Sequence, residues 1–325
     1  MTEKAFHIPV LVQEVIENMK LKPEGVYVDC TVGGAGHSHA MLSVEPSINL
    51  FCFDHDEEAI QTAKNRLKEY KSQITFINDN FKNFRSWLAL RKINKVDGIL
   101  MDLGVSNHQI SESSRGFSFM ENGILDMRMD RKIDTNAFKI VNNYPFEELY
   151  KIFHIYGEER YSKRIAQQIV EKRKISEIKT TQELANIVEN SVPDKSKVSL
   201  IKSKSRIFQA LRITVNKELE ILLPSLKDAI SALKTGGRLL VISWHSLEDR
   251  IVKECFRDEA SDCRCPISQS LNIPPKPKGH QSCACQHKKR LIIITKKPIT
   301  PMDSEIQKNS NSRSAKMRVS ERKGE

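Results

Sequence analysis

The sequence predicts an α/β protein in which a mostly parallel sheet is interrupted by a helical insertion. From the start of the chain to Gly104, short β-rich runs alternate with helical apolar periods, which is typical of parallel strands covered by helices. The strand pattern then stops, and it returns only at Arg238. We expect a first sheet part at 1–110, an inserted helical domain at 111–207, a second sheet part at 208–300 and a basic, flexible tail at 301–325.

Each element has its own local signal. Strands are predicted at the apolar runs 26–30, 50–53, 74–77, 96–101, 238–244 and 291–296. Helices are predicted from apolar stripes at 10–19, 59–70, 145–157, 162–174 and 180–193. Thr180 and Glu183 form a capping box for the last of these helices. A long helix from Phe208 is expected to be interrupted at Pro224 and to end at Gly236-Gly237.

The composition is that of a globular protein. Of 325 residues, 39% are hydrophobic and 29% charged, which excludes a wholly disordered or collagen-like chain. No apolar run approaches the ~20 residues that span a bilayer, and no secretory signal precedes the first helix, so we expect a cytoplasmic protein without membrane contact. Lys and Arg outnumber Asp and Glu by 52 to 41, with the excess concentrated at 160–212 and 288–325. These basic stretches favour a polyanion such as RNA, and solvated surface charge is the alternative.

The turn at 29–38 is the strongest local signal for a ligand site. Its small residues let a ligand lie against the backbone, and a helix that begins there offers free amide donors. His39 stands where a dinucleotide-binding G-x-G-x-x-G motif needs its third glycine, which weakens the interpretation as a nicotinamide-dependent oxidoreductase. Asp29 suits instead a nucleoside that carries an ammonium group. A purely structural turn is the alternative.

Polar or aromatic side chains follow the next three predicted strands. Asp54 ends the second strand, where an acid can bind both ribose hydroxyls. Phe81 follows the third strand, where its ring could hold an adenine, and Asp102 ends the fourth. Ligands of open α/β sheets bind beyond the carboxyl ends of the strands, so these residues are predicted to converge.

Motifs spread over nearly the whole chain carry a family resemblance. They are His7–Leu11, Asp29–Ser38, Asp102–Ser106, Arg115–Phe119, Leu125–Asp130, Tyr156–Arg160, Phe208–Arg212, Ser243–Arg250 and Arg313–Arg318. With these motifs the chain resembles the methyltransferase H (MraW-like) family of bacteria, which uses S-adenosylmethionine to methylate the 4-amino group of a cytidine in small-subunit (16S) rRNA near the decoding site. Asn107-His108 departs from the common Ser-Pro of this family, as do Ile124, Trp244 and Ser310-Asn311 from its usual residues.

The resemblance implies a fold, a cofactor and a partner. The fold is a class I, Rossmann-like methyltransferase with an inserted helical substrate domain, and the partner is small-subunit rRNA or the 30S particle. The residues implied to contact S-adenosylmethionine are Gly34, Ala35, Gly36, His37, Asp54, Phe81, Asp102 and Gln109. Those assigned to the target nucleotide are Arg115, Phe117, Arg128 and Asp130, although an ion-pair network of Arg128 with Asp126 or Asp130 is the alternative. The basic residues Lys163, Arg164, Lys172, Arg173 and Lys174 would hold phosphates.

The chemistry needs hydrogen-bond acceptors near the cytosine amine, whose lone pair is delocalised into the ring. Asp102, Ser243 and His245 are the candidates, since they lie at the predicted ends of two strands. Asp102 could instead serve only the donor, and His245 could be a structural histidine bonded to Glu248 or Asp249. A non-catalytic RNA-binding assembly factor is the alternative from a different functional class.

Cysteine usage adds one further candidate. The chain has 7 cysteines, an odd number that argues against a secreted disulfide framework and favours reduced thiols. Four of them form two C-x-C pairs, at Cys263, Cys265, Cys283 and Cys285. These pairs could hold a structural zinc ion, and free thiols are the alternative.

Overall fold

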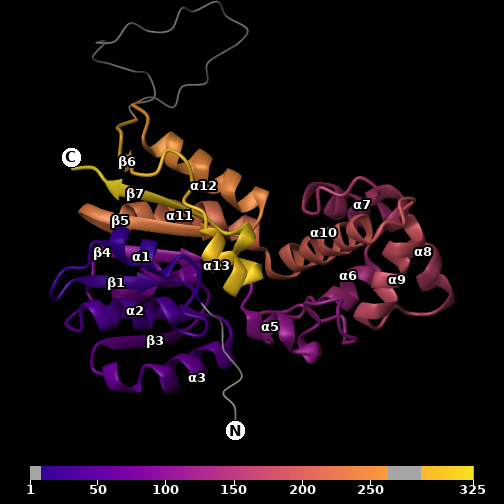
Figure 1. Cartoon of the computed structure of the whole chain (residues 1–325), viewed down its shortest axis with the longest axis horizontal. Coiled ribbons are helices and arrows are strands. Elements are labelled where there is room, and N and C mark those ends of the chain that lie inside the picture. The colour runs from indigo at the N-terminus through magenta and orange to yellow at the C-terminus, as the bar shows by residue number, and fades with distance from the viewer. Residues whose placement is uncertain (1–8, 263–286, 325) are drawn as a thin grey trace, which may run out of the picture. The chain divides into compact units, whose positions relative to one another are not determined.

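The computed structural model describes residues 9–262 and 287–324, and it shows two compact units (Figure 1). The sheet unit comprises 9–54, 62–104 and 222–324. The helical unit comprises 55–61 and 105–221. The helical unit is therefore mostly one insertion between the fourth and fifth strands, which confirms the insertion predicted from the loss of strand pattern.

The sheet unit contains one seven-stranded sheet in the order β3-β2-β1-β4-β5-β7-β6 (Figure 1). The five parallel strands are β1 (Val26–Asp29), β2 (Asn49–Asp54), β3 (Ile74–Asn78), β4 (Val96–Asp102) and β5 (Leu233–Ser243). β7 (Lys316–Arg322) runs antiparallel between β5 and β6 (Leu291–Ile293). The predicted α/β fold with a mostly parallel sheet is confirmed.

Helices cover both faces of this sheet. Val28, Ile99 and Leu239 stand in register on adjacent strands and point to one face. There they pack with α4 (Phe84–Leu90), α11 (Glu218–Ala232) and α12 (Ser246–Glu259). On the other face lies α1 (Val12–Met19), which packs on α2 (Gly36–Val44). A Cβ on Gly98 would lie 2.5 Å from the sulfur of Met19, so only glycine allows this close approach of α1.

The helical unit has its own core. Its helices are α5 (Asn107–Ser111), α6 (Ala137–Asn143), α7 (Phe146–Ile155), α8 (Ser162–Ile175), α9 (Thr181–Ser191) and α10 (Lys197–Asn216). Leu149, Phe153 and Ile165 are fully buried in this core, as the apolar stripes predict. The capping box of Thr180 and Glu183 is present at the start of α9. No helix in the described ranges is both long and apolar enough to span a bilayer.

The predicted helix break at Pro224 is wrong. The chain breaks instead at Lys217, whose φ of 53° ends α10 in the left-handed region, and Pro224 lies inside α11. The predicted helix stop at Gly236-Gly237 is also displaced. α11 ends at Ala232, and Gly236, with φ of 77°, lies within β5. Apolar spacing that continues across a break hides it, because the pattern records burial and not backbone conformation.

The expectation of a flexible tail at 301–325 is also wrong. The segment forms α13 (Asp303–Lys308) and then β7, where Met317 and Val319 are fully buried. The charged residues between these apolar positions mask the strand pattern, but they find partners. The Arg318 guanidinium donates to Asp249 (2.6 Å), for example. The basic composition therefore predicted disorder where ion pairs allow a strand.

Candidate active site

The glycine-rich loop, residues 29–38, leads from β1 into α2 and is organised by its first acid. Asp29 is buried, and its carboxylate accepts hydrogen bonds from the Thr31 amide (3.1 Å) and the Ser38 hydroxyl (2.6 Å). Burial raises the pKa of Asp29, and the hydrogen bond from Ser38 opposes that effect. Because each carboxylate oxygen is bonded within the loop, Asp29 shapes the loop itself.

Small residues in this loop serve two purposes. Gly33 and Ala35 have φ of 47° and 59°, in the left-handed region that favours glycine. A Cβ on Gly36 would lie 2.5 Å from Cγ of Pro9, so a larger residue does not fit there. A Cβ on Gly33 would instead meet just the Thr31 carbonyl oxygen, at 3.9 Å, among the described residues. The loop is therefore packed on one side and open on the other, as a site that binds a ligand against backbone requires.

Asp54, at the end of β2, is bonded to the same loop. Its Oδ2 accepts a hydrogen bond from the Gly33 amide (3.0 Å), and its carbonyl oxygen accepts one from the Asn78 side chain at the end of β3 (3.0 Å). The Gly34 carbonyl oxygen accepts a bond (2.8 Å) from an arginine of α3 (Glu57–Arg66). Phe81 opens a 3₁₀ turn shortly after β3 and packs, partly buried, against the core. The structure thus brings Asp54 and the loop together, as predicted.

His37 and Asp102 also meet in the sheet unit. The His37 Nε2 donates to the Val10 carbonyl oxygen (2.8 Å), and its Nδ1 lies 3.7 Å from Asp102 Oδ2. The other Asp102 oxygen accepts a bond from the Trp244 indole (3.1 Å), and the Asp102 amide donates to the Thr31 hydroxyl (2.8 Å). Three separate chain segments therefore fix Asp102 at the end of β4.

Ser243 and His245 lie at the end of β5 and are engaged in local structure. The Ser243 hydroxyl donates to the Lys316 carbonyl oxygen of β7 (3.3 Å). His245 caps α12: its Nδ1 accepts from the Glu248 amide (3.4 Å), and its Nε2 lies 3.2 Å from the Glu248 carboxylate. The Glu248 carboxylate also accepts from the Trp244 amide (2.8 Å). This is the structural pairing of His245 with Glu248 that the sequence left open.

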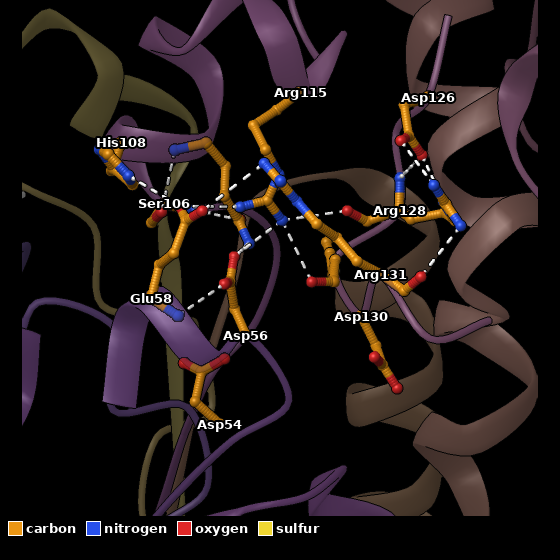
Figure 2. Close-up of polar contacts among 12 residues, drawn as sticks. Asp54, Asp56, Glu58, Ser106, His108, Arg115, Asp126, Arg128, Asp130 and Arg131 are labelled. Carbon is orange, nitrogen blue, oxygen red and sulfur yellow. Dashed lines mark hydrogen bonds and ion pairs between the residues drawn. The ribbon is translucent and has the colours of Figure 1, made fainter. Parts of the chain in front are cut away.

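In the helical unit, Arg115 forms the centre of a buried polar cluster, which we call the Arg115 hub (Figure 2). Its side chain is 2% exposed and lies 2.8 Å from the Asp56 carboxylate and 3.3 Å from that of Glu58. Its Nη2 also donates to the carbonyl oxygens of Arg128 (3.0 Å) and Met129 (3.1 Å). The guanidinium therefore joins the segment after β2 to the loop that contains Arg128.

Gln109 belongs to the same hub. Its Oε1 accepts from the Ser106 amide in the capping box of α5 (3.1 Å), and its Nε2 donates to Asp56 Oδ2 (2.8 Å). Neither Asp56 nor Glu58 was among the residues predicted for the site. The signal that could have found them is the alternation of acids at 54, 56 and 58 directly after a strand.

The remaining residues assigned to the nucleotide have internal contacts. Arg128 forms a two-pronged ion pair with Asp126 (2.6 and 2.9 Å), which is the alternative considered for it from the sequence. Asp130 accepts a hydrogen bond from the Lys132 amide (2.9 Å). The Phe117 ring is largely buried, with the Arg115 guanidinium 5.9 Å from its centre. The four clustered cysteines, Cys263, Cys265, Cys283 and Cys285, lie outside the described residues.

Comparison with known proteins places the chain among rRNA methyltransferases. The chain is 46% identical over 317 residues to the ribosomal RNA small subunit methyltransferase H of Clostridioides difficile (strain 630), covering 97% of this chain and 98% of that protein. The same enzyme of Finegoldia magna is 45% identical, with the same coverage. A solved rRNA methylase of Streptococcus thermophilus aligns over 98% of this chain and 99% of its own, with 10% identity and a TM-score of 0.43. The sequence profile of the MraW methylase family matches residues 4–323, and the chain belongs to this family.

Proposed function

We propose that the protein transfers a methyl group from S-adenosylmethionine to the exocyclic 4-amino group of a cytidine in small-subunit (16S) rRNA, near the decoding site. Its relatives are named for small-subunit rRNA methylation, and the match extends over nearly the whole chain. The observation that carries the proposal is the junction of the glycine-rich loop, Asp54 and Asp102 at the carboxyl ends of β1, β2 and β4. Such a substrate places the protein in the bacterial cytoplasm.

The residues at this junction suit a sulfonium nucleoside. The loop is open at Gly33, and no side chain of the described residues caps the start of α2 at Ala35, so backbone amides there can face a ligand. The residues that would hold the donor are Gly34, Ala35, Gly36 and His37 of the loop, Asp54 for the ribose, Phe81 for the adenine, and Asp102 and Gln109. When bound, S-adenosylmethionine supplies a methyl group already activated by its positive sulfur.

Asp102 is the group we assign to the reacting amine. Alignment of amine, methyl and sulfur can supply ~7–11 kcal/mol in favourable systems, so the protein must chiefly orient the cytosine. The Asp102 carboxylate accepts hydrogen bonds from the amine and spreads its developing positive charge. The Trp244 indole fixes the orientation of this carboxylate. Ser243 and His245 act indirectly, because their contacts with Lys316 and Glu248 hold the turn that presents Trp244.

The helical unit supplies the RNA-binding surface of this proposal. Lys163, Arg164, Lys172 and Lys174 are exposed along α8, and phosphate neutralisation by such residues releases counterions. A reaction at the cytosine amine also requires an unstacked base, which loosely paired RNA supplies at low cost. Arg128, Phe117 and Asp130 belong to the loop that we assign to this base.

The test is methyl transfer by the purified full-length protein to 16S rRNA, offered free and as the 30S particle. Labelled S-adenosylmethionine is the donor, and mass spectrometry of the rRNA locates the product. We expect 4-methylcytidine with wild type and a loss of about 10²–10⁴-fold in kcat with Asp102→Asn. The affinity of that variant for S-adenosylhomocysteine should remain close to that of wild type.

Asp303→Asn, on exposed α13, is the matched control and should methylate as wild type does. RNA that binds without becoming methylated would favour an assembly factor and overturn the proposal. Full activity of Asp102→Asn would remove Asp102 from the chemistry. A second readout is salt: RNA affinity should fall steeply between 50 and 200 mM, by about 10³-fold for six or more phosphate contacts.

A further inference from the structure

The Arg115 hub joins groups that the proposed function uses for different ligands. Gln109, assigned to the methyl donor, donates to Asp56 Oδ2 at 2.8 Å, and the same oxygen lies 2.8 Å from Arg115 Nη2. Arg115 in turn holds the carbonyl oxygens of Arg128 and Met129, in the loop assigned to the cytidine (Figure 2). A single carboxylate oxygen is therefore shared between a donor-side amide and a nucleotide-side guanidinium.

The orientation of this carboxylate is fixed. Asp56 is buried, and its second oxygen accepts from the Glu58 amide in the first turn of α3 (3.1 Å). Asp56 also follows Asp54, assigned to the ribose, by two residues along the backbone. A buried ion pair cannot lose one partner without leaving an uncompensated charge, so the pair resists rearrangement. A shift on the donor side is thus passed to Arg115 instead of being absorbed.

The loop that Arg115 holds has an unusual backbone. Met127 has φ of 60°, a left-handed conformation that is strained for a non-glycine residue and persists only where its surroundings impose it. The Met127 amide donates to the Arg115 carbonyl oxygen (2.9 Å). On the other side, Asn216 of α10 bonds both the Met127 carbonyl oxygen and the Met129 amide (each 2.8 Å). Arg115 and Asn216 together impose this conformation.

We infer that Arg115 is a positioning residue that couples the donor site to the nucleotide loop, so that bound donor and bound RNA strengthen each other's affinity. The inference rests on the proposed function, and it changes the role expected for Arg115 from the sequence. A side chain that is 2% exposed and bonded to carboxylates and carbonyl oxygens inside the protein offers no surface to a nucleotide. It acts through the backbone at Arg128 and Met129. Such coupling is reciprocal, because it is a single free energy shared by two sites.

The test measures the affinity of the full-length protein for a 16S rRNA fragment with and without saturating S-adenosylhomocysteine. For wild type we expect the product to tighten RNA binding by about 5- to 150-fold, the usual range of coupling between sites. Arg115→Lys keeps the charge but loses the planar fork of donors, so this factor should fall close to one. The rise in KM should fall on the RNA, with about a 10²-fold loss in kcat/KM from misplacement of the loop. The KM for the methyl donor should stay near that of wild type.

Arg131→Lys is the matched control. Arg131 lies 3.5 Å from the Glu58 carboxylate, as Arg115 does at 3.3 Å, but its side chain is 57% exposed. This variant should keep the wild-type coupling factor. Asp56→Asn removes the shared carboxylate from the other side and should abolish the coupling as Arg115→Lys does.

Hydrogen exchange on wild type tests the inference without any variant. S-adenosylhomocysteine should slow exchange at the Met127 and Met129 amides, and equal rates with and without it would overturn the inference. A wild-type coupling factor of one, or full coupling in Arg115→Lys, would do the same. Either result would leave the proposed function standing if wild type still methylates 16S rRNA, whereas absence of methylation by wild type would remove the proposed function itself.

Discussion

The glycine-rich loop of the sheet unit and the Arg115 hub of the helical unit are built from opposite materials. The loop depends on left-handed backbone at Gly33 and Ala35 and on the missing side chain of Gly36. The hub depends on the Arg115 guanidinium and the Asp56 carboxylate, both buried. The loop is therefore specified by volume and backbone angle, and the hub by charge and hydrogen-bond direction.

This difference follows from what each region must do. A loop that receives a ligand against its backbone must leave space, so it uses residues with little or no side chain. A hub that keeps two chain segments together must fill its space, so it uses long side chains that are fully bonded. We expect the loop to tolerate loss of charge better than gain of volume, and the hub to show the reverse.

The largest expected effect comes from removing charge from the hub without changing its volume. Asp56→Asn leaves the Arg115 guanidinium buried without its nearest carboxylate, which should lower the free energy of unfolding by about 3–5 kcal/mol in urea denaturation. Asp134→Asn is the control, since Asp134 is an exposed partner of Lys139 and its loss should cost within about 0.5 kcal/mol. A loss below about 1 kcal/mol for Asp56→Asn would show that Glu58 and the backbone carbonyls alone satisfy Arg115.

A smaller effect is expected from adding volume to the loop. Gly36→Ala places a Cβ against the ring of Pro9, which should cost about 1–3 kcal/mol of stability and weaken binding of S-adenosylhomocysteine in calorimetry. Ala35→Gly removes a side chain from a left-handed residue and should change stability by less than about 1 kcal/mol. If Gly36→Ala binds the product as wild type does, volume is not what specifies the loop.

The smallest effect concerns a charge of the sheet unit near the start of β4. Burial alone would raise the pKa of Asp97, but bonds from Lys234 (2.6 Å) and the Val26 amide (3.0 Å), with the charge of Lys22, outweigh it and lower the pKa below its ordinary 3.8. The ionised form is thus favoured on folding, so its stabilisation is complete above about pH 4 and is lost as pH falls through the lowered pKa.

Asp97→Asn should remove this acid-dependent part of the stability, less than about 1 kcal/mol because Lys234 is 46% exposed. Unfolding curves of wild type and Asp97→Asn between pH 7 and pH 2 measure the difference, which should shrink toward the acid end. A difference that grows on acidification would contradict the assigned direction of the shift.

The sequence predicted the elements whose signals are local. The strands up to Asp102, the capping box at Thr180 and the loop before α2 all follow from runs of about ten residues or fewer. The contact of Asp54 with the glycine-rich loop also followed, because the carboxyl ends of neighbouring parallel strands meet.

What the sequence missed depends on contacts between distant positions. Asp56 and Arg115 are 59 positions apart in the chain, and nothing at either position shows that one neutralises the other. Arg115 therefore looked like an exposed cation free to bind a nucleotide. β7 was missed for the same reason, because its charged residues are paid for by partners such as Asp249 on another element.

The place of β7 has a consequence for the timing of synthesis. β7 lies between β5 and β6, and on the same late segment Glu305 of α13 accepts a bond from the Leu11 amide (2.9 Å), beside the Val10 carbonyl that orients His37. These late residues leave the translating ribosome well after β1 to β5 have emerged. The nascent polypeptide therefore cannot finish its catalytic pocket until translation is nearly complete, which keeps it inert toward the very particle that is making it.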